Sequence, residues 1–478
     1  MTHNYLFGKL AAIAALCLVF FSCSNMEEEI SVNDSANTQQ VFQSPYHLTI
    51  DEAQARLEQY IRDLESSDSP NKLHFTSHEI TSRYAADLSP VMTRTGGTLF
   101  PSVYIFNIGN NQGYSVVSQD SRVQSPYALA TTGRLEQGMT KYNYNESIML
   151  QMADLTARQM EAALQVIEPY DPDLDRLTMC TTYYPSGDSD GMCTVKWHQY
   201  APYNAYCPIL TNGENASAGG LAVAMAQMMS IFRHPSSYTT TGLNPNESTT
   251  FNWTQMILGT ETGNDMIAKL MYYLGLPENL NMTYSIGHSH ASTANIPHTL
   301  ENFGYASGAQ ISRYSANKAF TELSAGRPTI VSHNHGYAPT VYDIMGLRID
   351  YSNDMVTRNG MSEVDSIFMP GVNILVHGGR KDEYKWMPSG IVEFTCRQLF
   401  CNIGEGGEGN GWYMVDCTYY NPSSRSSSNE TSEEESETGE EQDFYSIINP
   451  GAGSGLDPRQ YSVLLGVTIV TGIQVAEE

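Results

Sequence analysis

Apolar and polar positions follow different patterns in the two parts of the chain. In the first part, residues 50–64 place apolar side chains every three to four positions, directly behind the capping-box sequence Thr49-Ile-Asp-Glu52, which predicts an amphipathic helix. Two β-prone runs follow around a turn at 110–113 and predict a hairpin, and helical spacing returns over 148–167. Residues 46–167 are therefore predicted to form a small α+β domain.

The pattern changes after this first domain. Residues 168–192 are rich in Pro, Asp and Gly and are predicted to be a linker. A larger domain is predicted over 193–478, with apolar helices at about 217–233 and 264–275. Within it, the low-complexity acidic run at 423–443 cannot bury apolar surface, so we expect this segment to be mobile.

Residues 1–23 are typical of a lipoprotein signal peptide. The apolar stretch 10–21 is short for a membrane span and has the length of a signal core. Phe21-Ser22-Cys23 resembles a bacterial lipobox, which predicts cleavage before Cys23 and lipidation of its sulfur; an ordinary secretory signal is the alternative. Residues 24–45 are then a flexible tether. We expect a lipoprotein of the outer membrane or cell surface of a bacterium, with its soluble domains outside the cytoplasm.

Net charge and cysteine content limit the classes of partner and cofactor that the sequence leads us to expect. The chain has 25 Lys and Arg against 52 Asp and Glu, so its formal net charge is −27. Nucleic acids and anionic membranes are bound through basic patches, so no nucleic acid is expected as a partner, and the membrane only through the lipid anchor. Six cysteines follow Cys23 and allow 15 disulfide pairings; their spacing is not that of a zinc site, so neither a metal nor another cofactor is expected. These cysteines are Cys180, Cys193, Cys207, Cys396, Cys401 and Cys417.

Four segments of the second domain resemble, in order and spacing, the streptopain family of secreted bacterial cysteine peptidases. They lie at 195–204, 218–227, 327–330 and 400–413. Residues 104–122 resemble the inhibitory propeptide of that family. The resemblance implies an α+β fold of the papain-like, streptopain type, a two-subdomain cysteine peptidase fold preceded by a small α+β propeptide domain. Residues 347–397 and 423–443 are then insertions. The activity that it implies is that of a cysteine-type endopeptidase, a hydrolase.

The nucleophile of this chemistry is missing. A cysteine peptidase needs a thiolate, and the family places its Cys at the N-terminus of the central helix, where the helix dipole lowers the thiol pKa. The family pattern Ala-Gly-Cys-Val-Ala-x-Ala-Met-Ala-Gln corresponds here to a segment with Gly220 at the Cys position. Glycine has no side chain and cannot attack a peptide bond. Ser217, Cys207 and Cys401 are the candidate replacements, and none of them is favoured as a nucleophile.

The base is missing as well. The family has a Gly-His-Ala segment, and the best match in this chain is Gly336-Tyr337-Ala338, so Tyr337 stands at the His position. A phenol with a pKa of about 10 is a poor base near neutral pH. His333 and His335 lie close by; either is a candidate for a displaced base, and ordinary loop histidines are the alternative.

Two supporting residues of the family are kept. Asn402 matches the Asn that orients the imidazole, and Gln199 matches the Gln that donates to the oxyanion, although a purely structural hydrogen bond would preserve a Gln equally well. Glu405 replaces a family Trp. A carboxylate there suits either a peptide cleft that prefers cations or a solvated loop.

These residues predict a peptidase scaffold without peptidase chemistry. The favoured interpretation is a non-catalytic pseudopeptidase with a zymogen-like architecture, which binds a peptide or protein ligand in the former substrate cleft or sequesters an inhibitor of active relatives. An active cysteine peptidase with a displaced Cys and His is the first alternative, and an anchored structural or adhesive protein is the second. Because self-cleavage needs the thiolate, the N-terminal domain is expected to remain attached.

Overall fold

The computed structural model describes most of the chain between residue 46 and residue 476. The longer described ranges are 46–66, 75–87, 102–135, 177–185, 193–285, 289–333, 372–386, 392–420 and 467–476, with shorter strand and helix pieces between them. The chain divides into Met1–His47 and Leu48–Glu478, and the second of these is one compact unit. The predicted signal peptide, the tether and the acidic run at 423–443 lie outside the described residues.

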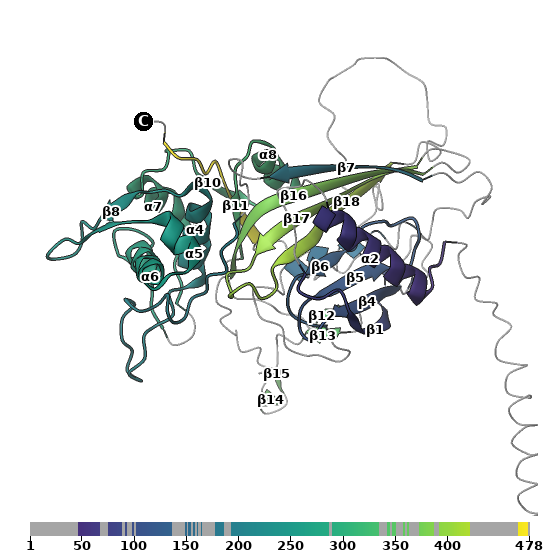
Figure 1. Cartoon of the computed structure of the whole chain (residues 1–478), viewed down its shortest axis with the longest axis horizontal. Coiled ribbons are helices and arrows are strands. Elements are labelled where there is room, and N and C mark those ends of the chain that lie inside the picture. Colours follow the sequence, from purple (N-terminus) through teal and green to yellow (C-terminus); the bar gives the residue numbers. More distant parts are fainter. Residues whose placement is uncertain are drawn as a thin grey trace, which may run out of the picture. The chain divides into compact units, whose positions relative to one another are not determined.

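The first part of the large unit is a helix on an antiparallel sheet, shown in Figure 1 in purple and blue. Its helix α2 begins as the capping box predicts, because the Thr49 amide donates to the Glu52 carboxylate at 2.8 Å and the Glu52 amide donates to the Thr49 hydroxyl at 3.3 Å. The predicted hairpin is confirmed as β4 paired with β5. The elements are α2 Ile50–Ser66, β1 Ile80–Asp87, β2 Val91–Met92, β3 Thr98–Leu99, β4 Ser102–Ile108, β5 Tyr114–Ser118 and β6 Ala128–Ala130.

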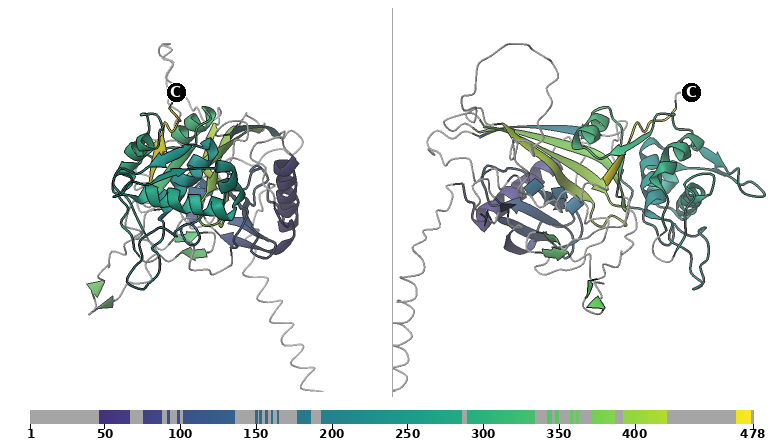
Figure 2. Two further views of the ribbon diagram at one scale, coloured as in Figure 1. Left: turned by 60° about the vertical axis from the view of Figure 1, so that its left-hand side comes forward. Right: turned by 180° about the vertical axis from the view of Figure 1, so that it is seen from behind.

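The rest of the unit combines helices with long strands, which confirms the predicted α+β class. Figures 1 and 2 show β16 and β17 as long twisted strands. The helices are α4 Gly220–Phe232, α5 Trp253–Leu258, α6 Glu261–Gly275, the short η1 Thr293–Asn295, α7 Ile296–Asn302 and α8 Ala316–Ser324. The strands are β7 Leu177–Pro185, β8 Ser237–Thr239, β9 Ser248–Thr250, β10 Gln310–Arg313, β11 Thr329–His333, β12 Tyr342–Ile344, β13 Leu347–Ile349, β14 Thr357–Arg358, β15 Met361–Ser362, β16 Val372–Trp386, β17 Val392–Asn402, β18 Gly411–Tyr420 and β19 Val467–Thr471.

One antiparallel sheet runs through both of the predicted domains. Its strand order is β1-β4-β5-β6-β18-β17-β16-β11-β19-β10, and β7 pairs with β16. The two parts meet where β6 pairs with β18, with Ala130 opposite Gly411 and Ala128 opposite Tyr413. The backbone groups at this edge of β18 are therefore satisfied by the N-terminal part of the chain.

Side chains of the second part are buried in the core of the first. Phe400 from β17 and Trp412 from β18 pack in one apolar cluster with side chains of α2, β4, β5 and β6. The buried amide of Gln398 accepts a hydrogen bond from the Tyr60 hydroxyl at 2.8 Å, and the buried Asp382 carboxylate accepts one from Ser125. The two parts thus share apolar burial and buried polar groups, which makes separation unfavourable.

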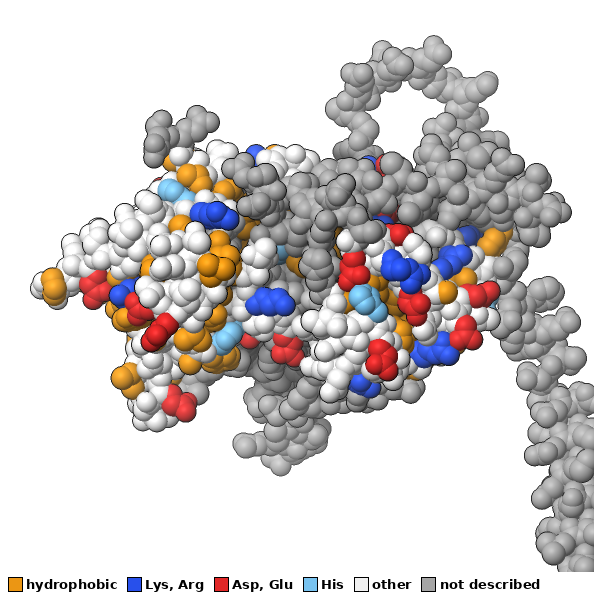
Figure 3. Space-filling model, viewed as in Figure 1, with side chains coloured by type: hydrophobic (Ala, Val, Ile, Leu, Met, Phe, Trp, Pro, Cys, Tyr) orange, Lys and Arg blue, Asp and Glu red, His pale blue; other side chains and the backbone are white. Residues whose placement is uncertain are grey.

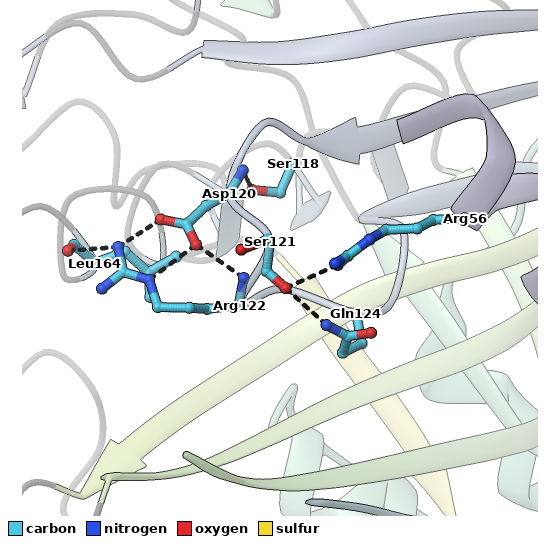
Figure 4. Close-up of polar contacts among 7 residues, drawn as sticks. All are labelled: Arg56, Ser118, Asp120, Ser121, Arg122, Gln124 and Leu164. Carbon is cyan, nitrogen blue, oxygen red and sulfur yellow. Dashed lines mark hydrogen bonds and ion pairs between the residues drawn. The ribbon is translucent and has the colours of Figure 1, made fainter. Parts of the chain in front are cut away.

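A buried ion pair orders the chain after β5 (Figure 4). The Arg122 guanidinium donates to both carboxylate oxygens of Asp120 and also to the Leu164 carbonyl at 2.9 Å. The Asp120 amide donates to the Ser118 hydroxyl at 2.9 Å, and the Arg56 guanidinium donates to the Ser121 carbonyl at 2.8 Å. This network connects α2, the turn after β5 and the helical positions between 149 and 164.

The structure corrects two predictions of chain organisation. Residues 168–192 were predicted as a linker, but Leu177–Pro185 is strand β7 and pairs with β16 along its whole length. Residues 347–397 were predicted as an insertion, but residues 372–386 form the central strand β16 and residues 392–397 belong to β17. The hydrogen-bond partner of β7 lies far away in the sequence, whereas β16 pairs with its chain neighbour β17 as well as with the distant strands β7 and β11.

The tertiary structure shows which of the possible cysteine pairs forms a disulfide. Cys396 and Cys417 lie opposite each other on β17 and β18 and form the one disulfide of the described residues, while Cys193, Cys207 and Cys401 are free and buried. Cys180 lies in β7, and its side chain is outside the described part. No helix among the described residues has the length and apolar character that a membrane span requires.

We expect the substitution Trp412→Ala to lower the free energy of unfolding by about 3–5 kcal/mol, because it empties a site at the centre of the shared core. Circular dichroism during urea unfolding would measure this loss as a shift of a single transition. Leu258→Ala is the matched control, since that side chain is 72% exposed and its removal is expected to change stability by less than about 0.5 kcal/mol. Two transitions, of which only one shifts, would contradict a shared core.

Candidate functional site

The candidate site lies at the N-terminus of α4, the helix whose residues from Leu221 to Ser230 are all buried. The helix begins at Gly220 after the N-cap residue Gly219, which has φ 88° and offers no capping side chain. A Cβ on Gly219 would lie 2.9 Å from the Met282 sulfur and 3.0 Å from the Ser289 carbonyl oxygen, so this position requires glycine.

Gly220 has no such requirement. Outside its chain neighbours and the helix backbone, the described atom nearest to a Cβ built on it is the amide nitrogen of Asn373, at 3.8 Å. A Cβ at this position would therefore meet no close contact among the described residues. Within that part of the chain, neither backbone conformation nor packing requires glycine at position 220.

Of the described side chains, that of Asn373 lies nearest to a Cβ built on Gly220. It lies near the start of β16, a strand in contact with α4, and its carbonyl oxygen accepts a hydrogen bond from the Ser332 hydroxyl at 2.8 Å. An amide has no basic nitrogen and cannot take a proton from a nucleophile. Sequence reasoning missed Asn373 because it lies in the stretch predicted as an insertion; the β-prone run Val372–Val376 was the signal that could have revealed it.

Gln199 lies beside the helix tip, but its amide donor is already engaged. The Gln199 carbonyl accepts a hydrogen bond from the Ala218 amide at 2.8 Å, which fixes the segment next to α4. Its side-chain nitrogen donates to the Glu405 carboxylate at 3.0 Å. The structure thus brings together two residues that the sequence singled out separately. One of the two N–H groups of this amide therefore binds a carboxylate, and the negative charge of that carboxylate disfavours a developing oxyanion at the same point.

Asn402 makes structural contacts at the end of β17. Its side-chain nitrogen donates to the Val195 carbonyl at 2.9 Å and lies 3.5 Å from the Cys193 sulfur, while its oxygen accepts from the Gly404 amide at 3.2 Å. These partners take up both N–H groups of the Asn402 amide and one of the two lone pairs of its oxygen. Among the described residues, a thiol, and no imidazole, has a hydrogen bond to Asn402.

Cys193 is nevertheless a poor nucleophile. Its thiol is buried, and burial raises its pKa to about 11, against the smaller opposing effect of hydrogen bonds from Ser230 and other groups. Burial likewise raises the pKa of Cys207 to about 12 and raises that of Cys401. The Ser217 hydroxyl is buried and accepts a hydrogen bond from the Ser289 amide at 2.9 Å. None of these groups is an exposed, activated nucleophile.

The proposed bases are only partly visible. Tyr337 and His335 lie outside the described residues, and His333 ends β11 with a side chain that is not described, so these assignments stay predictions. His377 on β16 is fully buried against Phe400, and burial lowers its pKa to about 3. His198 is half-buried next to Gln199; burial lowers its pKa also, and its Nδ1 accepts a hydrogen bond from the Tyr200 amide at 3.2 Å.

The described residues hold no group of three or more His, Cys, Asp or Glu side chains placed to bind a metal ion. The chemistry that the described atoms around Gly220 offer is hydrogen bonding by amides and by one carboxylate. This arrangement can hold a ligand, but it lacks a group that attacks a carbonyl carbon.

The raised thiol pKa values predict slow alkylation of the native protein at pH 8. A pKa near 11 leaves about one Cys193 thiol in a thousand ionised at that pH, and the thiolate is the reacting form. Mass spectrometry after iodoacetamide treatment should find Cys193, Cys207 and Cys401 unmodified in the native chain and modified after unfolding in urea. Rapid, stoichiometric labelling of native Cys193 would show an activated thiol.

The different surroundings of the two glycines predict opposite responses to alanine. Gly220→Ala should leave stability unchanged or raise it by up to about 1 kcal/mol, because the position is helical and has free space. Gly219→Ala should lower it by more than about 1 kcal/mol, because of the positive φ and the close Ser289 carbonyl. Urea unfolding of both variants measures the difference, and a larger loss for Gly220→Ala would mean that the tip is packed differently.

A protein-family model matches the part of the chain that contains this site. Residues 197–413 match the model of the Peptidase C10 family, a range that includes Gln199, Gly220, Asn373 and Asn402. No curated protein matches the chain.

Two solved structures from Prevotella intermedia are similar to the chain. A mutant prointerpain A fragment has 17% identity and a TM-score of 0.42 and covers 83% of this chain and 100% of its own. Active wild-type interpain A, a cysteine protease, has 21% identity and a TM-score of 0.31 and covers 47% of this chain and 84% of its own. The family match confirms the predicted papain-like, streptopain-type fold. Residues 197–413, with the site around Gly220, belong to the Peptidase C10 family of cysteine peptidases, the streptopain family.

Proposed function

We propose that this protein is a catalytically inactive member of the Peptidase C10 family that binds a peptide or protein in its former substrate cleft. One observation carries the proposal: the tip of α4 presents Gly220, and the nearest described side chain is the Asn373 amide. Among the described residues, the surroundings of Gly220 therefore offer neither a thiol nor an imidazole, and acyl transfer to the enzyme requires both a nucleophile and a base.

Exposed aromatic side chains in the segment after Gln199 are suited to binding. The segment after Gln199 carries Tyr200 and Tyr206, which are 43% and 40% exposed. Exposed tyrosines present a rigid apolar ring and a hydroxyl, a combination that is enriched in binding surfaces. On the face drawn in Figure 3, basic side chains are interspersed with acidic ones, which is not the pattern of a nucleic-acid site.

The proposal includes location and processing. We propose that Cys23 carries a lipid that anchors the protein at the bacterial surface, and that the N-terminal domain stays attached. Two observations support retention of that domain: β6 completes the edge of β18, and β7, within the region where an activating cut would be expected, is paired to β16. A chain without the nucleophile also cannot cut itself.

The full chain is expected to bind peptides without cleaving them. Fluorescence polarisation of labelled degenerate peptide pools would measure binding, and mass spectrometry of the same samples after a day should find the peptides intact. An epoxide warhead of the kind that modifies papain-like thiolates should leave the protein unlabelled. Gly220→Cys is the matched control, since it places a thiol at a helix N-terminus, where the dipole lowers the thiol pKa and favours labelling.

The possible results separate the three functions. Peptide cleavage, or stoichiometric labelling of the natural chain, would favour an active peptidase with displaced catalytic groups. The absence of any peptide binding would favour an anchored structural or adhesive protein.

A further inference from the structure

Asn373 lies on the face of β16 that is turned toward α4. Strand β16 is in contact with α4, and Leu375 of β16 packs with Ile330 of β11 in one apolar cluster with the side chains of α4. Side chains alternate across a strand, so Asn373, two positions before Leu375, lies on the same face. On β11, Ser332 is the residue opposite Asn373, and Ile330 is the residue opposite Leu375. This face therefore continues from the apolar core to the N-terminus of α4.

A hydrogen bond determines which end of the Asn373 amide faces the helix tip. Its carbonyl oxygen accepts from the Ser332 hydroxyl at 2.8 Å, on the side of β11. The amide nitrogen is then the atom nearest to Gly220, at 3.8 Å from a Cβ built there. Both Asn373 and Ser332 are buried. The register of two strands and one buried hydrogen bond thus hold the nitrogen in place.

The distance between the two positions is suited to a pair of side chains. The sulfur of a cysteine is bonded directly to its Cβ, so in a suitable rotamer a thiol at position 220 would come within hydrogen-bond reach of the nitrogen at position 373. The Nδ1 of an imidazole and the amide nitrogen of Asn are the same number of bonds from their Cβ. A histidine at position 373 would therefore place a basic nitrogen where Asn373 has its amide.

We propose that Asn373 occupies the place at which a base would face a nucleophile at position 220. The absence of a nucleophile–base pair is then explained by one contact, between Gly220 and Asn373. The inference rests on the proposed function, because it locates the cause of inactivity in that same site. It differs from the sequence-based assignment of Tyr337, which depended on a match shortly after β11, whereas the pairing of β11 with β16 puts Asn373 beside the helix tip.

A thiol introduced by Gly220→Cys is a probe of this contact. Gly220 is partly exposed, so iodoacetamide should reach the thiol, and peptide mapping by mass spectrometry gives its labelling rate as a function of pH. Adding Asn373→His should move the midpoint of this profile to lower pH by about one to three pH units, because a protonated imidazole nearby favours the thiolate. Glu405 and His198 are common to all variants, so a difference between variants reports residue 373.

Two further variants make the test independent of the fold of the first. Asn373→Asp has the shape of Asn and keeps an acceptor for Ser332; combined with Gly220→Cys it should move the midpoint to higher pH, because a nearby carboxylate disfavours the thiolate. Tyr337→His combined with Gly220→Cys is the matched control. It adds the same imidazole at the position that the sequence match indicated and should leave the midpoint of Gly220→Cys unchanged.

The possible results decide between the assignments. A midpoint that responds to Tyr337→His and not to substitutions at position 373 would overturn the proposal. A low midpoint in Gly220→Cys alone that is lost on His333→Ala or His335→Ala would overturn it too, because a displaced imidazole would then face the thiol. Peptide binding by the natural chain is measured separately: its absence would refute the proposed function and leave the contact standing, whereas peptide cleavage by the natural chain would overturn both.

Discussion

The antiparallel ladder of β16, β17 and β18 is the constraint on which the other features depend. Its strands supply Asn373 at the tip of α4, Asn402 at the end of β17 and the loop that carries Glu405. The same strands bury Phe400 and Trp412 in the core beneath α2. Because backbone pairing specifies register residue by residue, the site and the N-terminal core are positioned by one set of hydrogen bonds.

The two glycines at the start of α4 have different surroundings. At Gly219 the backbone itself demands glycine, whereas one residue later the space beside Gly220 is open. The described surroundings of Gly220 would therefore accept a Cβ. Near it, the Gln199 side chain donates to Glu405, and the Asn402 side chain donates to a backbone carbonyl and lies close to a buried thiol.

The Glu405 carboxylate gives the site a negative charge. A peptidase cleft uses uncharged donors to stabilise an anion that develops during the reaction. In this chain the Glu405 carboxylate accepts a hydrogen bond from the Gln199 side chain. A carboxylate at this point is electrostatically opposite to an oxyanion hole. The N-terminal domain takes part, because Thr132 holds the loop that positions the carboxylate.

Local patterns in the sequence were sufficient for the capping box of α2, the β4–β5 hairpin, the α4 helix and the α+β class, since each depends on neighbours within a few residues or on a pattern shared with a family. The family match also rests on sequence, and with it the identification of Gly220 as the residue at the Cys position. Strand β16, inside the predicted insertion, pairs with its chain neighbour β17 and with the distant strands β7 and β11. Two further features depended on distant contacts alone: β7 inside the predicted linker, and the pairing of Gln199 with Glu405 across 206 positions. Strand partners and side-chain neighbours of this kind are decided by the packing of the whole unit, which no local periodicity reports.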